Sequence, residues 1–383
     1  MTTSFKPQVA VYYFPNYHLD PINERTHGKG WTEWELVKRA TPRFPGHEQP
    51  KEPLWGYLDE SKPETAERQI AAAADHGIDA FIYDWYWYDN QPFLHRALEE
   101  GYLHAENRER LKFALMWANH DWLNIFPYKR GMNHTVLSSG LVSDEAFEAA
   151  TDYVIANYFS QPSYWRVNGG LYFSFYELMS LIQSFGTMDA TKRALDRFRT
   201  KVRAAGLGEL HVNAVVWGIQ NLPGEKKLER PDEMARALGV DSVTSYVWIH
   251  NVPLEEFPTV DYAKVAKQAE QDWTKFKHEF SVPYFPNVSM GWDPSPRTVQ
   301  SDIYDALGYP FTPIITGNTP ESFEEAMNAV KKFLAGSDEG VPQIVTVNSW
   351  NEWTEGSYIE PDTVHGTAYL EAIRRVFGDT SNV

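Results

Sequence analysis

The chain has 383 residues and carries 35 Lys and Arg against 52 Asp and Glu, a formal net charge of −17. This balance repels phosphate backbones and anionic lipid headgroups, so it argues against nucleic acid or a charged membrane surface as the partner. The sequence contains no Cys, which excludes disulfides, thiolate metal sites and cysteine nucleophiles. Its 14 Trp, 21 Tyr and 21 Phe make up 15% of the residues, and we expect some of them to face a ligand.

The first residues of the chain and its apolar stretches indicate in which cellular compartment it is expected. The first residues lack the apolar run of about 7 to 15 residues that a secretory signal peptide requires. No later stretch approaches the roughly 18 apolar residues of a membrane span. We therefore expect no membrane insertion and a soluble, cytoplasmic chain as given, or a secreted or periplasmic one if a leader was trimmed.

Short apolar runs rich in β-branched and aromatic residues recur along the chain, and a helical pattern follows each of them. The runs predict eight strands, at 9–14, 80–85, 112–117, 171–175, 211–216, 242–247, 284–288 and 344–348. Ser61 and Glu64 have the spacing of a capping box before a helix that ends at Gly77. Thr319 and Pro320 predict the start of a helix that runs to Gly336.

The alternation of strands and helices predicts the α/β class. Nearly continuous apolar strands are typical of a parallel sheet that is buried on both faces, and eight strand–helix units predict a single (β/α)8 TIM barrel. An open doubly wound sheet is the main alternative, but no G-x-G-x-x-G or G-x-x-x-x-G-K-[ST] motif follows a strand. We expect residues 1–383 to form one catalytic domain, with long loops after strands 1 and 3 at about 15–60 and 119–143.

The residues that follow the predicted strands point to a sugar ligand. Nearly every strand is followed by a Trp or Tyr together with an amide or a carboxylate, and a sugar ring needs an apolar face to stack on and polar groups at its edge. The alternative is that the aromatic residues pack the top of the barrel. The candidates for substrate binding are Tyr13, Asn16, Trp34, Asp84, Trp85, Trp87, Trp117, Asn119, Asp121, Glu177, Trp217, Tyr246, Trp248, Trp292, Trp350 and Asn351.

The segment N-S-W-N-E-W-T-E-G at 348–356 provides the candidate catalytic residues, Glu352 and Glu355. Residues three apart on one helical turn point to the same side. Two adjacent carboxyl groups push their pKa values apart, which leaves one as an acid and the other as a base. A solvated loop with two surface glutamates is the alternative, and the flanking Trp350 and Trp353 argue against it.

Two further groups of residues are weaker candidates. His120 and Asp121, with Asp84 and Asp89, have side chains that bind metals, but their spacing matches no metal motif. The favoured interpretation is a contact to sugar hydroxyls or a buried, hydrogen-bonded His. The G-K-G-W-T-E-W stretch at 28–34 predicts that the first loop reaches over the cleft, with Lys29 or Glu33 at the substrate or with its Trp residues in a structural role. The sequence implies no metal and no organic cofactor.

Three segments resemble the WbsX-like family: 15–50, which contains P-N-Y-H-L-D and G-H-E-Q-P, then G-I-D-A-F-I-Y-D-W-Y-W-Y-D at 77–89, and S-W-N-E-W-T-E-G-S-Y-I-E-P-D at 349–362. That family is similar to glycoside hydrolase family 99, the retaining endo-α-mannosidases and endo-α-mannanases. The resemblance implies a barrel in which Glu352 acts as a base on the sugar's own 2-hydroxyl. A 1,2-anhydro sugar forms, and Glu355 protonates the leaving oxygen and later serves as a base.

The sequence departs from these families at two places. Many WbsX-like chains carry W-A-N-E-N-W after strand 3, whereas here His120, Asp121 and Trp122 follow Asn119. Thr354 stands where family 99 has His. Both changes lie at the candidate site and bear on which sugar is preferred.

The favoured function is a retaining hydrolase of α-linked manno-configured sugars, of the α-mannoside or α-rhamnoside type, with an oligosaccharide or polysaccharide substrate. A glycosyltransferase of polysaccharide biosynthesis is an alternative, although such enzymes need a metal motif or basic residues for the diphosphate. A silent sugar-binding barrel is another. The last is an ordinary retaining glycosidase, with Glu177 as acid/base and Glu352 or Asp293 as nucleophile.

Overall fold

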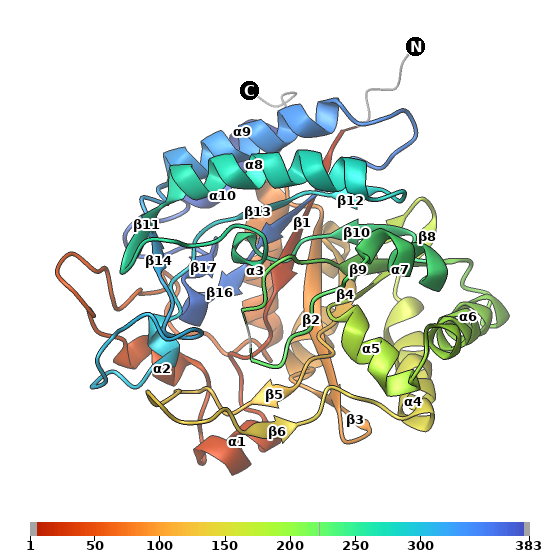
Figure 1. Cartoon of the computed structure of the whole chain (residues 1–383), viewed down its shortest axis with the longest axis horizontal. Helices are drawn as coiled ribbons and strands as arrows, with labels where there is room; N and C mark the ends of the chain where they lie inside the picture. The colour runs from red at the N-terminus through yellow and green to blue at the C-terminus, as the bar shows by residue number, and fades with distance from the viewer. Residues whose placement is uncertain (1–5, 222, 379–383) are drawn as a thin grey trace.

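Nine parallel strands form the centre of the structure, in the order β12-β10-β9-β8-β4-β2-β1-β15-β13 (Figure 1). The structure is a computed structural model and describes residues 6–221 and 223–378. The strands of this path are β1 (Gln8–Tyr13), β2 (Ala80–Tyr88), β4 (Lys112–Trp117), β8 (Gly170–Phe175), β9 (Leu210–Val215), β10 (Ser242–Thr244), β12 (Tyr284–Phe285), β13 (Asn287–Ser289) and β15 (Ile344–Asn348).

The two ends of this path are halves of one predicted strand. β12 pairs with β10 and β13 pairs with β15, and only Pro286 separates the two halves. Proline has no N–H to donate to a neighbouring strand, so the ladder of backbone hydrogen bonds is interrupted at this residue. The Pro286 carbonyl still accepts a bond of 2.9 Å from the Thr346 amide. The sheet therefore returns to its start, which confirms the predicted barrel and excludes the open doubly wound sheet.

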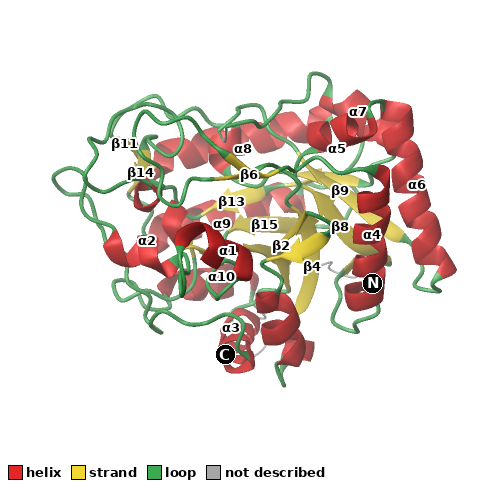
Figure 2. Cartoon of the chain, turned by 90° about the horizontal axis from the view of Figure 1, so that it is seen from below, coloured by secondary structure: helices red, strands yellow, loops and turns green. Residues whose placement is uncertain are grey.

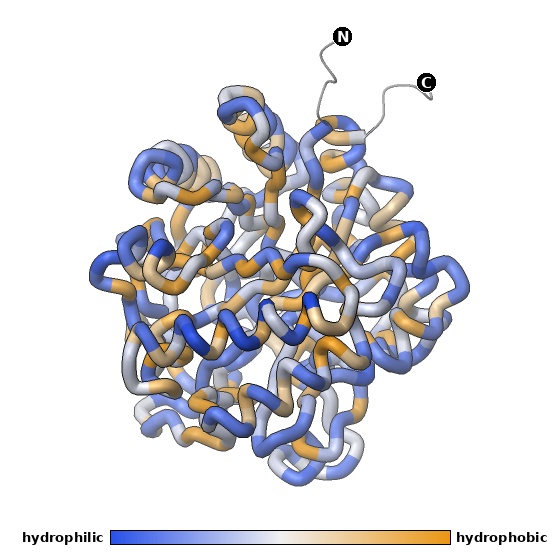
Figure 3. The backbone as a smooth tube through the Cα atoms, turned by 90° about the vertical axis from the view of Figure 1, so that its right-hand side faces the viewer, coloured by the Kyte–Doolittle hydropathy of each residue, from blue (hydrophilic) through white to orange (hydrophobic). Residues whose placement is uncertain are grey.

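The helices surround this barrel (Figure 2). On α6, for example, Ala194, Leu195, Phe198 and Val202 are buried, while the tube in Figure 3 shows hydrophilic and hydrophobic segments mixed along the outer helices. Within the described residues, no helix combines the length and the apolar character that crossing a bilayer requires. The α-helices are α1 (Pro21–His27), α2 (Trp34–Arg39), α3 (Pro63–Asp75), α4 (Asp144–Val154), α5 (Leu178–Phe185), α6 (Met188–Ala204), α7 (Pro231–Leu238), α8 (Tyr262–Glu279), α9 (Pro320–Ala335) and α10 (Ala368–Phe377).

One predicted helix cap is confirmed and the other is wrong. The Thr319 side chain accepts from the Ser322 amide at the start of α9, as expected. At α3 the N-cap is Lys62, and the Ser61 hydroxyl instead donates to Asp59 at 2.7 Å. The nearby Asp59 carboxylate competes for that hydroxyl, which the S-x-x-E spacing does not reveal.

The two long loops contain structure of their own. The loop after β1 holds α1 and α2, and the loop after β4 forms a hairpin of β5 (Trp122–Leu123) and β6 (Val136–Ser138). The Tyr128 amide in this second loop donates to the Arg297 carbonyl at 2.7 Å, so it is joined to the loop after β13. The remaining short strands are β3 (Gln91–Phe93), β7 (Arg166–Val167), β11 (Thr259–Asp261), β14 (Ile314–Thr316), β16 (Asn351–Glu352) and β17 (Ser357–Tyr358).

Candidate active site

A cleft with about 820 Å³ of empty space, which includes its open, solvent-filled part, lies among the loops that follow the carboxyl ends of the barrel strands. This is the end of a (β/α)8 barrel at which active sites are built. Its lining is aromatic and aliphatic on the side of the β5–β6 hairpin and rich in carboxyl groups elsewhere. The described lining residues are Phe14, Asp84, Tyr86, Met116, Ala118, His120, Asp121, Trp122, Leu123, Ile125, Phe126, Tyr176, Asn221, Pro223, Gly224, Glu225, Tyr246, Val247, His250, Trp292, Arg297, Glu352 and Glu355.

The segment after β15 is held rigidly from behind. The Asn351 side chain bonds both the N–H and the carbonyl of Phe14 at 2.8 Å, which ties the segment to the end of β1. The Trp353 ring stacks on Tyr358 with centroids 3.7 Å apart, and its Nε1 donates to Glu360 at 2.9 Å. These buried contacts leave Glu352 and Glu355 facing the cleft.

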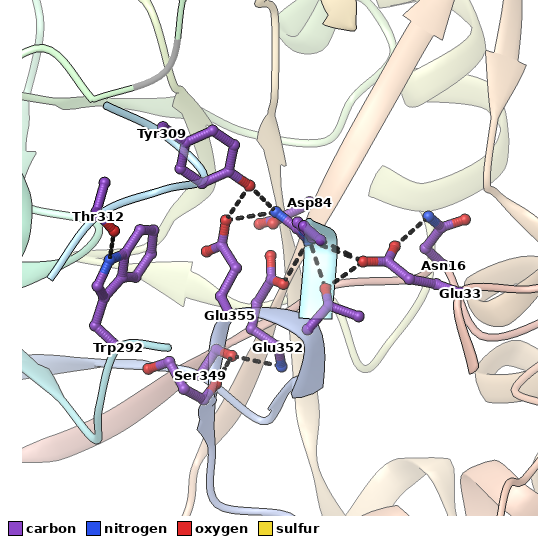
Figure 4. A network of polar contacts seen from close by, with 12 residues as sticks. Asn16, Glu33, Asp84, Trp292, Tyr309, Thr312, Ser349, Glu352 and Glu355 are labelled. Atoms are coloured by element: carbon purple, nitrogen blue, oxygen red, sulfur yellow. Dashed lines mark hydrogen bonds and ion pairs between the residues drawn. The ribbon is translucent and has the colours of Figure 1, made fainter. Parts of the chain in front are cut away.

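Both glutamates contact one guanidinium group. Arg297 donates from Nη2 to Glu352 Oε2 at 3.0 Å and from Nη1 to Glu355 Oε1. Figure 4 shows the two carboxylates pointing the same way, toward this network. The Tyr309 hydroxyl also donates to Glu355 Oε1, at 2.9 Å. The shared cation fixes the two carboxyl groups relative to each other on one wall of the cleft.

A third carboxylate completes the surroundings of Arg297. Glu33 Oε1 accepts from Arg297 Nη2 at 3.0 Å and also from the Thr354 hydroxyl. The other Glu33 oxygen accepts from Asn16 at 2.5 Å. Glu33 therefore acts behind Arg297 rather than in the lining of the cleft, and it reaches the site from the G-K-G-W-T-E-W loop.

The protonation of the pair follows from this charge balance. Burial raises the pKa of Glu352 well above its ordinary value, the Glu355 charge adds to this, and Arg297 counteracts it only in part. Burial also raises the pKa of Glu355, against the effect of Arg297 and Tyr309. One buried cation cannot balance three carboxylates, so the coupled pair binds a proton more readily than free glutamates do.

The floor of the cleft joins opposite sides of the barrel. Tyr246, after β10, donates from its hydroxyl to Asp84 Oδ2 on β2 at 2.9 Å. Burial raises the pKa of Asp84 well above its ordinary value, and the Tyr246 hydrogen bond opposes this shift. The other oxygen, Oδ1, is buried and has no partner among the described residues.

The sequence profile of the family described as Glycosyltransferase WbsX matches residues 9–373. The chain belongs to this family. Among curated proteins, it is 28% identical over 378 residues to an uncharacterized protein, WxcX, of Xanthomonas campestris pv. campestris. The match covers 96% of this chain and 49% of that protein, so this chain spans about half the length of its curated relative.

Solved structures share the fold of this WbsX family chain. A glycoside hydrolase-like protein superposes with a TM-score of 0.62 at 15% identity and covers 98% of this chain and 95% of the other. GH99 endo-alpha-mannosidase from Bacteroides thetaiotaomicron superposes with a TM-score of 0.52 at 14% identity, covering 97% of each chain. At such identities the likeness shows the fold, and together with the family profile it confirms the resemblance that the sequence suggested.

The structure brings together part of the predicted site of this WbsX family chain. Six of the predicted residues line the cleft: Asp84, Asp121, Tyr246, Trp292, Glu352 and Glu355. Trp292 is oriented by its Nε1, which donates to Thr312 at 2.9 Å. Asp121 Oδ1 accepts from the Gly140 amide at 2.8 Å, which anchors the loop after β4.

Five predicted aromatic residues pack in the shell around the cleft and are absent from its described lining. Trp85 and Trp87 stack with centroids 5.6 Å apart, and Trp117 meets Trp85 edge-on at 5.4 Å. Trp350 is fully buried against Phe81, and Trp217 packs on Tyr176 at 5.1 Å. For these rings packing is the observed role, and substrate contact stays a prediction.

The remaining predicted residues make hydrogen bonds outside the described lining. Trp34 donates to Leu58 O at 2.7 Å, Trp248 to Asn287 O at 2.9 Å, and Tyr13 to Gln69 at 2.9 Å. Asn119 exchanges two bonds of 2.8 Å with the Glu177 backbone. Asn16 and Asn351 position Glu33 and Phe14 as described above, and Glu177 Oε1 accepts from the Lys226 amide at 2.8 Å.

Sequence reasoning did not single out Arg297 or Glu225. Arg297 follows β13 in W-D-P-S-P-R, where no spacing motif marks it, and only its burial among carboxylates reveals its role. Glu225 lies in the long segment after β9, with no apolar pattern to place it. Across residues 6–221 and 223–378, no group of three or more His, Cys, Asp or Glu is placed to hold a metal ion. His120, Asp121, Asp84 and Asp89 therefore do not form such a group.

Replacing the shared cation in this WbsX family chain is expected to destabilise the fold in a pH-dependent way. Arg297→Met removes one partner of a buried ion network, which costs about 3–5 kcal/mol. Arg297 lowers the pKa of both Glu352 and Glu355, so its loss raises both values further and the folded variant binds more protons than the folded wild type near neutrality. Its free energy of unfolding therefore falls more steeply than that of the wild type as pH rises from about 5 to about 8. Urea unfolding at both pH values measures this.

Arg203→Met is the matched control, since Arg203 is half exposed and pairs with an exposed glutamate. We expect it to unfold like the wild type at both pH values. An Arg297→Met protein whose stability loss is the same at the two pH values would show that the carboxyl groups do not depend on this cation.

Proposed function

We propose that this chain is a retaining glycoside hydrolase of α-linked manno-configured sugars, of the α-mannoside or α-rhamnoside type, whose nucleophile is the substrate's own 2-hydroxyl. The observation that carries the proposal is the shared guanidinium. Arg297 holds Glu352 and Glu355 on one wall of the cleft, one turn apart. An enzyme nucleophile and an acid must flank the glycosidic bond, whereas two carboxyl groups on one wall suit a reaction in which the substrate supplies the nucleophile.

The proposed steps assign one proton transfer to each glutamate. Ionised Glu352 takes the proton of the 2-hydroxyl, whose oxygen attacks C1 while protonated Glu355 gives its proton to the leaving glycosidic oxygen. Glu355, now ionised, then takes a proton from water as that water attacks C1 and opens the 1,2-anhydro ring. Glu352 returns its proton to the 2-oxygen. The raised pKa values of the coupled pair support a resting state with one proton shared between the two.

The charge of the cleft supports hydrolysis over the transfer that the family description names. Five carboxyl groups and one arginine lie in the described lining: Asp84, Asp121, Glu225, Glu352, Glu355 and Arg297. Arg297 already bonds three carboxylates. A sugar-nucleotide diphosphate would enter a field of like charge, while a neutral glycoside would not.

The placement of Glu177 and Asp293 supports the substrate's hydroxyl as nucleophile over an ordinary enzyme nucleophile. Neither belongs to the described lining of the cleft. Asp293 Oδ2 accepts from Gln49 at 2.6 Å and lies 2.8 Å from His47 Nε2. Burial raises the pKa of Asp293, but the hydrogen bonds from His47, Ser295 and Gln49 outweigh burial and hold the pKa below its usual value.

The substrate class is tested with a panel of aryl α-glycosides and α-linked oligosaccharides. We expect cleavage of manno-configured and not of gluco-configured α-glycosides, because the 2-hydroxyl is trans to an α leaving group in the first and cis to it in the second. Proton NMR should detect the α anomer as the first product. Release of the β anomer, or transfer from a sugar nucleotide without hydrolysis of any glycoside, would contradict the proposal.

Removing either carboxylate should slow the reaction without unfolding the chain. Glu352→Gln and Glu355→Gln each remove a proton-transfer partner at nearly constant volume, so turnover should fall about 10²-fold or more. Glu209→Gln, at a residue whose side chain is 64% exposed, is the control and should keep wild-type turnover. An unchanged rate in either active-site variant would exclude that glutamate from the chemistry.

A 2-fluoro substrate distinguishes the two retaining mechanisms. Without its 2-hydroxyl, an activated 2-deoxy-2-fluoro glycoside cannot close the anhydro ring, so we expect neither turnover nor a covalent adduct. Intact-protein mass spectrometry measures this. A glycosylated peptide containing Glu352, Glu177 or Asp293 would identify an enzyme nucleophile instead.

A further inference from the structure

A second polar wall faces the catalytic pair across the cleft. When β12 and β13 are counted as one strand, the barrel is a ring of eight, in which β8 and β15 lie four strands apart in either direction. Tyr176 follows β8, and Glu352 and Glu355 follow β15. Since all strands point the same way, these residues lie on opposite sides of one barrel mouth.

Glu225 is the centre of this second wall. Only 5% of its surface is exposed, and it lines the cleft. Its Oε1 accepts from the Tyr176 hydroxyl at 2.6 Å, and its Oε2 accepts from the Asn221 amide at 2.9 Å. Burial raises the pKa of Glu225, but His250 and these hydrogen bonds outweigh burial and hold the pKa below its usual value. A carboxylate that stays ionised is a strong acceptor for sugar hydroxyls.

His250 provides an independent sign that a ligand binds here. The residue lines the cleft and is 2% exposed. Its Nε2 lies 3.6 Å from Glu225 Oε1 and 3.4 Å from the Tyr176 hydroxyl. Its Nδ1 is buried and has no partner among the described residues. An unpaired buried nitrogen costs free energy unless something bonds it, and a ligand hydroxyl would do so.

The loop that carries Glu225 is anchored before any ligand arrives. The amide of the next residue, Lys226, donates to Glu177 Oε1 at 2.8 Å. On the other side, the amides of Gly218 and Ile219 donate to the His250 carbonyl at 3.0 and 2.7 Å. The carboxylate is therefore preorganised, which lowers the entropic cost of binding.

We infer that Glu225 and His250, with Tyr176, form a second sugar-binding subsite, which takes the hydroxyl groups of a sugar ring adjacent to the ring that reacts at Glu352 and Glu355. The inference rests on the proposed function for the identity of the ligand. Tyr176, Glu225 and His250 line the same cleft as Glu352 and Glu355, so a ligand with more than one ring can reach both walls. The substrate is then an oligosaccharide that spans the barrel mouth, and Glu225 selects for its length.

The test compares a one-ring with a three-ring substrate, 4-nitrophenyl α-mannoside and α-linked mannotriose, or the rhamnose equivalents if the wild type cleaves that series. Glu225→Gln keeps the size of the side chain but removes its charge. We expect kcat/KM for the trisaccharide to fall about tenfold or more, while kcat/KM for the aryl glycoside stays within twofold. Tyr176→Phe removes a hydrogen-bond donor to Glu225 and leaves the loop sequence intact. We expect it to lower kcat/KM for the trisaccharide more than for the aryl glycoside, by a smaller factor than Glu225→Gln does.

Glu229→Gln is the matched control, because Glu229 lies in the same loop and is exposed. We expect it to match the wild type with both substrates. An equal loss on both substrates in Glu225→Gln, or no loss on either, would overturn the second subsite.

Binding distinguishes a failure of this inference from a failure of the proposed function. Binding of mannotriose to the Glu352→Gln/Glu355→Gln protein is measured by the quenching of tryptophan fluorescence, which does not require turnover. We expect the added Glu225→Gln change to weaken this binding about tenfold or more. If the wild type binds mannotriose but does not hydrolyse it, the proposed function alone is wrong. If binding does not change in Glu225→Gln, the second subsite alone is wrong. If mannotriose does not bind, both are wrong.

Discussion

One buried cation organises the cleft. Arg297 is 4% exposed and donates to Glu33, Glu352 and Glu355, which come from two loops far apart in the chain. Arg297 also makes cation–π contacts with two aromatic rings. Its guanidinium carbon lies 5.5 Å from the centroid of the Phe14 ring and 5.2 Å from that of the Phe126 ring. A buried ion is stable only when it is paired and hydrogen-bonded. The loops after β1, β4, β13 and β15 are therefore held together by the same group that positions the two glutamates.

The charge imbalance at this cation has a chemical consequence. With three carboxylates on one guanidinium, the buried site holds excess negative charge, and protonation of one glutamate relieves it. Glu33 is fully buried behind the cation, while Glu352 and Glu355 line the cleft, so a ligand in the cleft meets the pair and not Glu33. The Tyr309 hydroxyl on Glu355 Oε1 makes the two members unequal, and two unequal carboxyl groups are what acid and base roles require.

The barrel could be predicted from the sequence because its strands are buried on both faces. The predicted strands at 112–117 and 344–348 match β4 and β15 without shift, since each is a continuous apolar run. Two details were not predicted. β12 and β13 are separated at Pro286, and the Ser61 hydroxyl donates to Asp59 instead of capping α3. Both depend on single hydrogen-bonding atoms, which a pattern of residue types does not resolve. Glu352 and Glu355 were visible because they share a motif. Arg297 and Glu225 were not, because they enter the site through irregular loops whose course is set by tertiary contacts.

The aromatic excess illustrates the same limit. Rings at strand ends suggested a stacking surface for sugars, yet Trp85, Trp87 and Trp117 pack on one another, and Trp350 and Trp353 are fully buried within the segment after β15. These buried rings lie outside the described lining of the cleft. Other rings at strand ends do line the cleft: Phe14, Tyr86, Tyr176 and Tyr246. The loops after β4 and β13 add Trp122, Phe126 and Trp292, of which Trp122 and Phe126 stack with centroids 5.2 Å apart. In the reaction and subsite that we propose, selection among substrates therefore depends on how far a ligand reaches from Glu352 and Glu355 toward Glu225, and not on stacking alone.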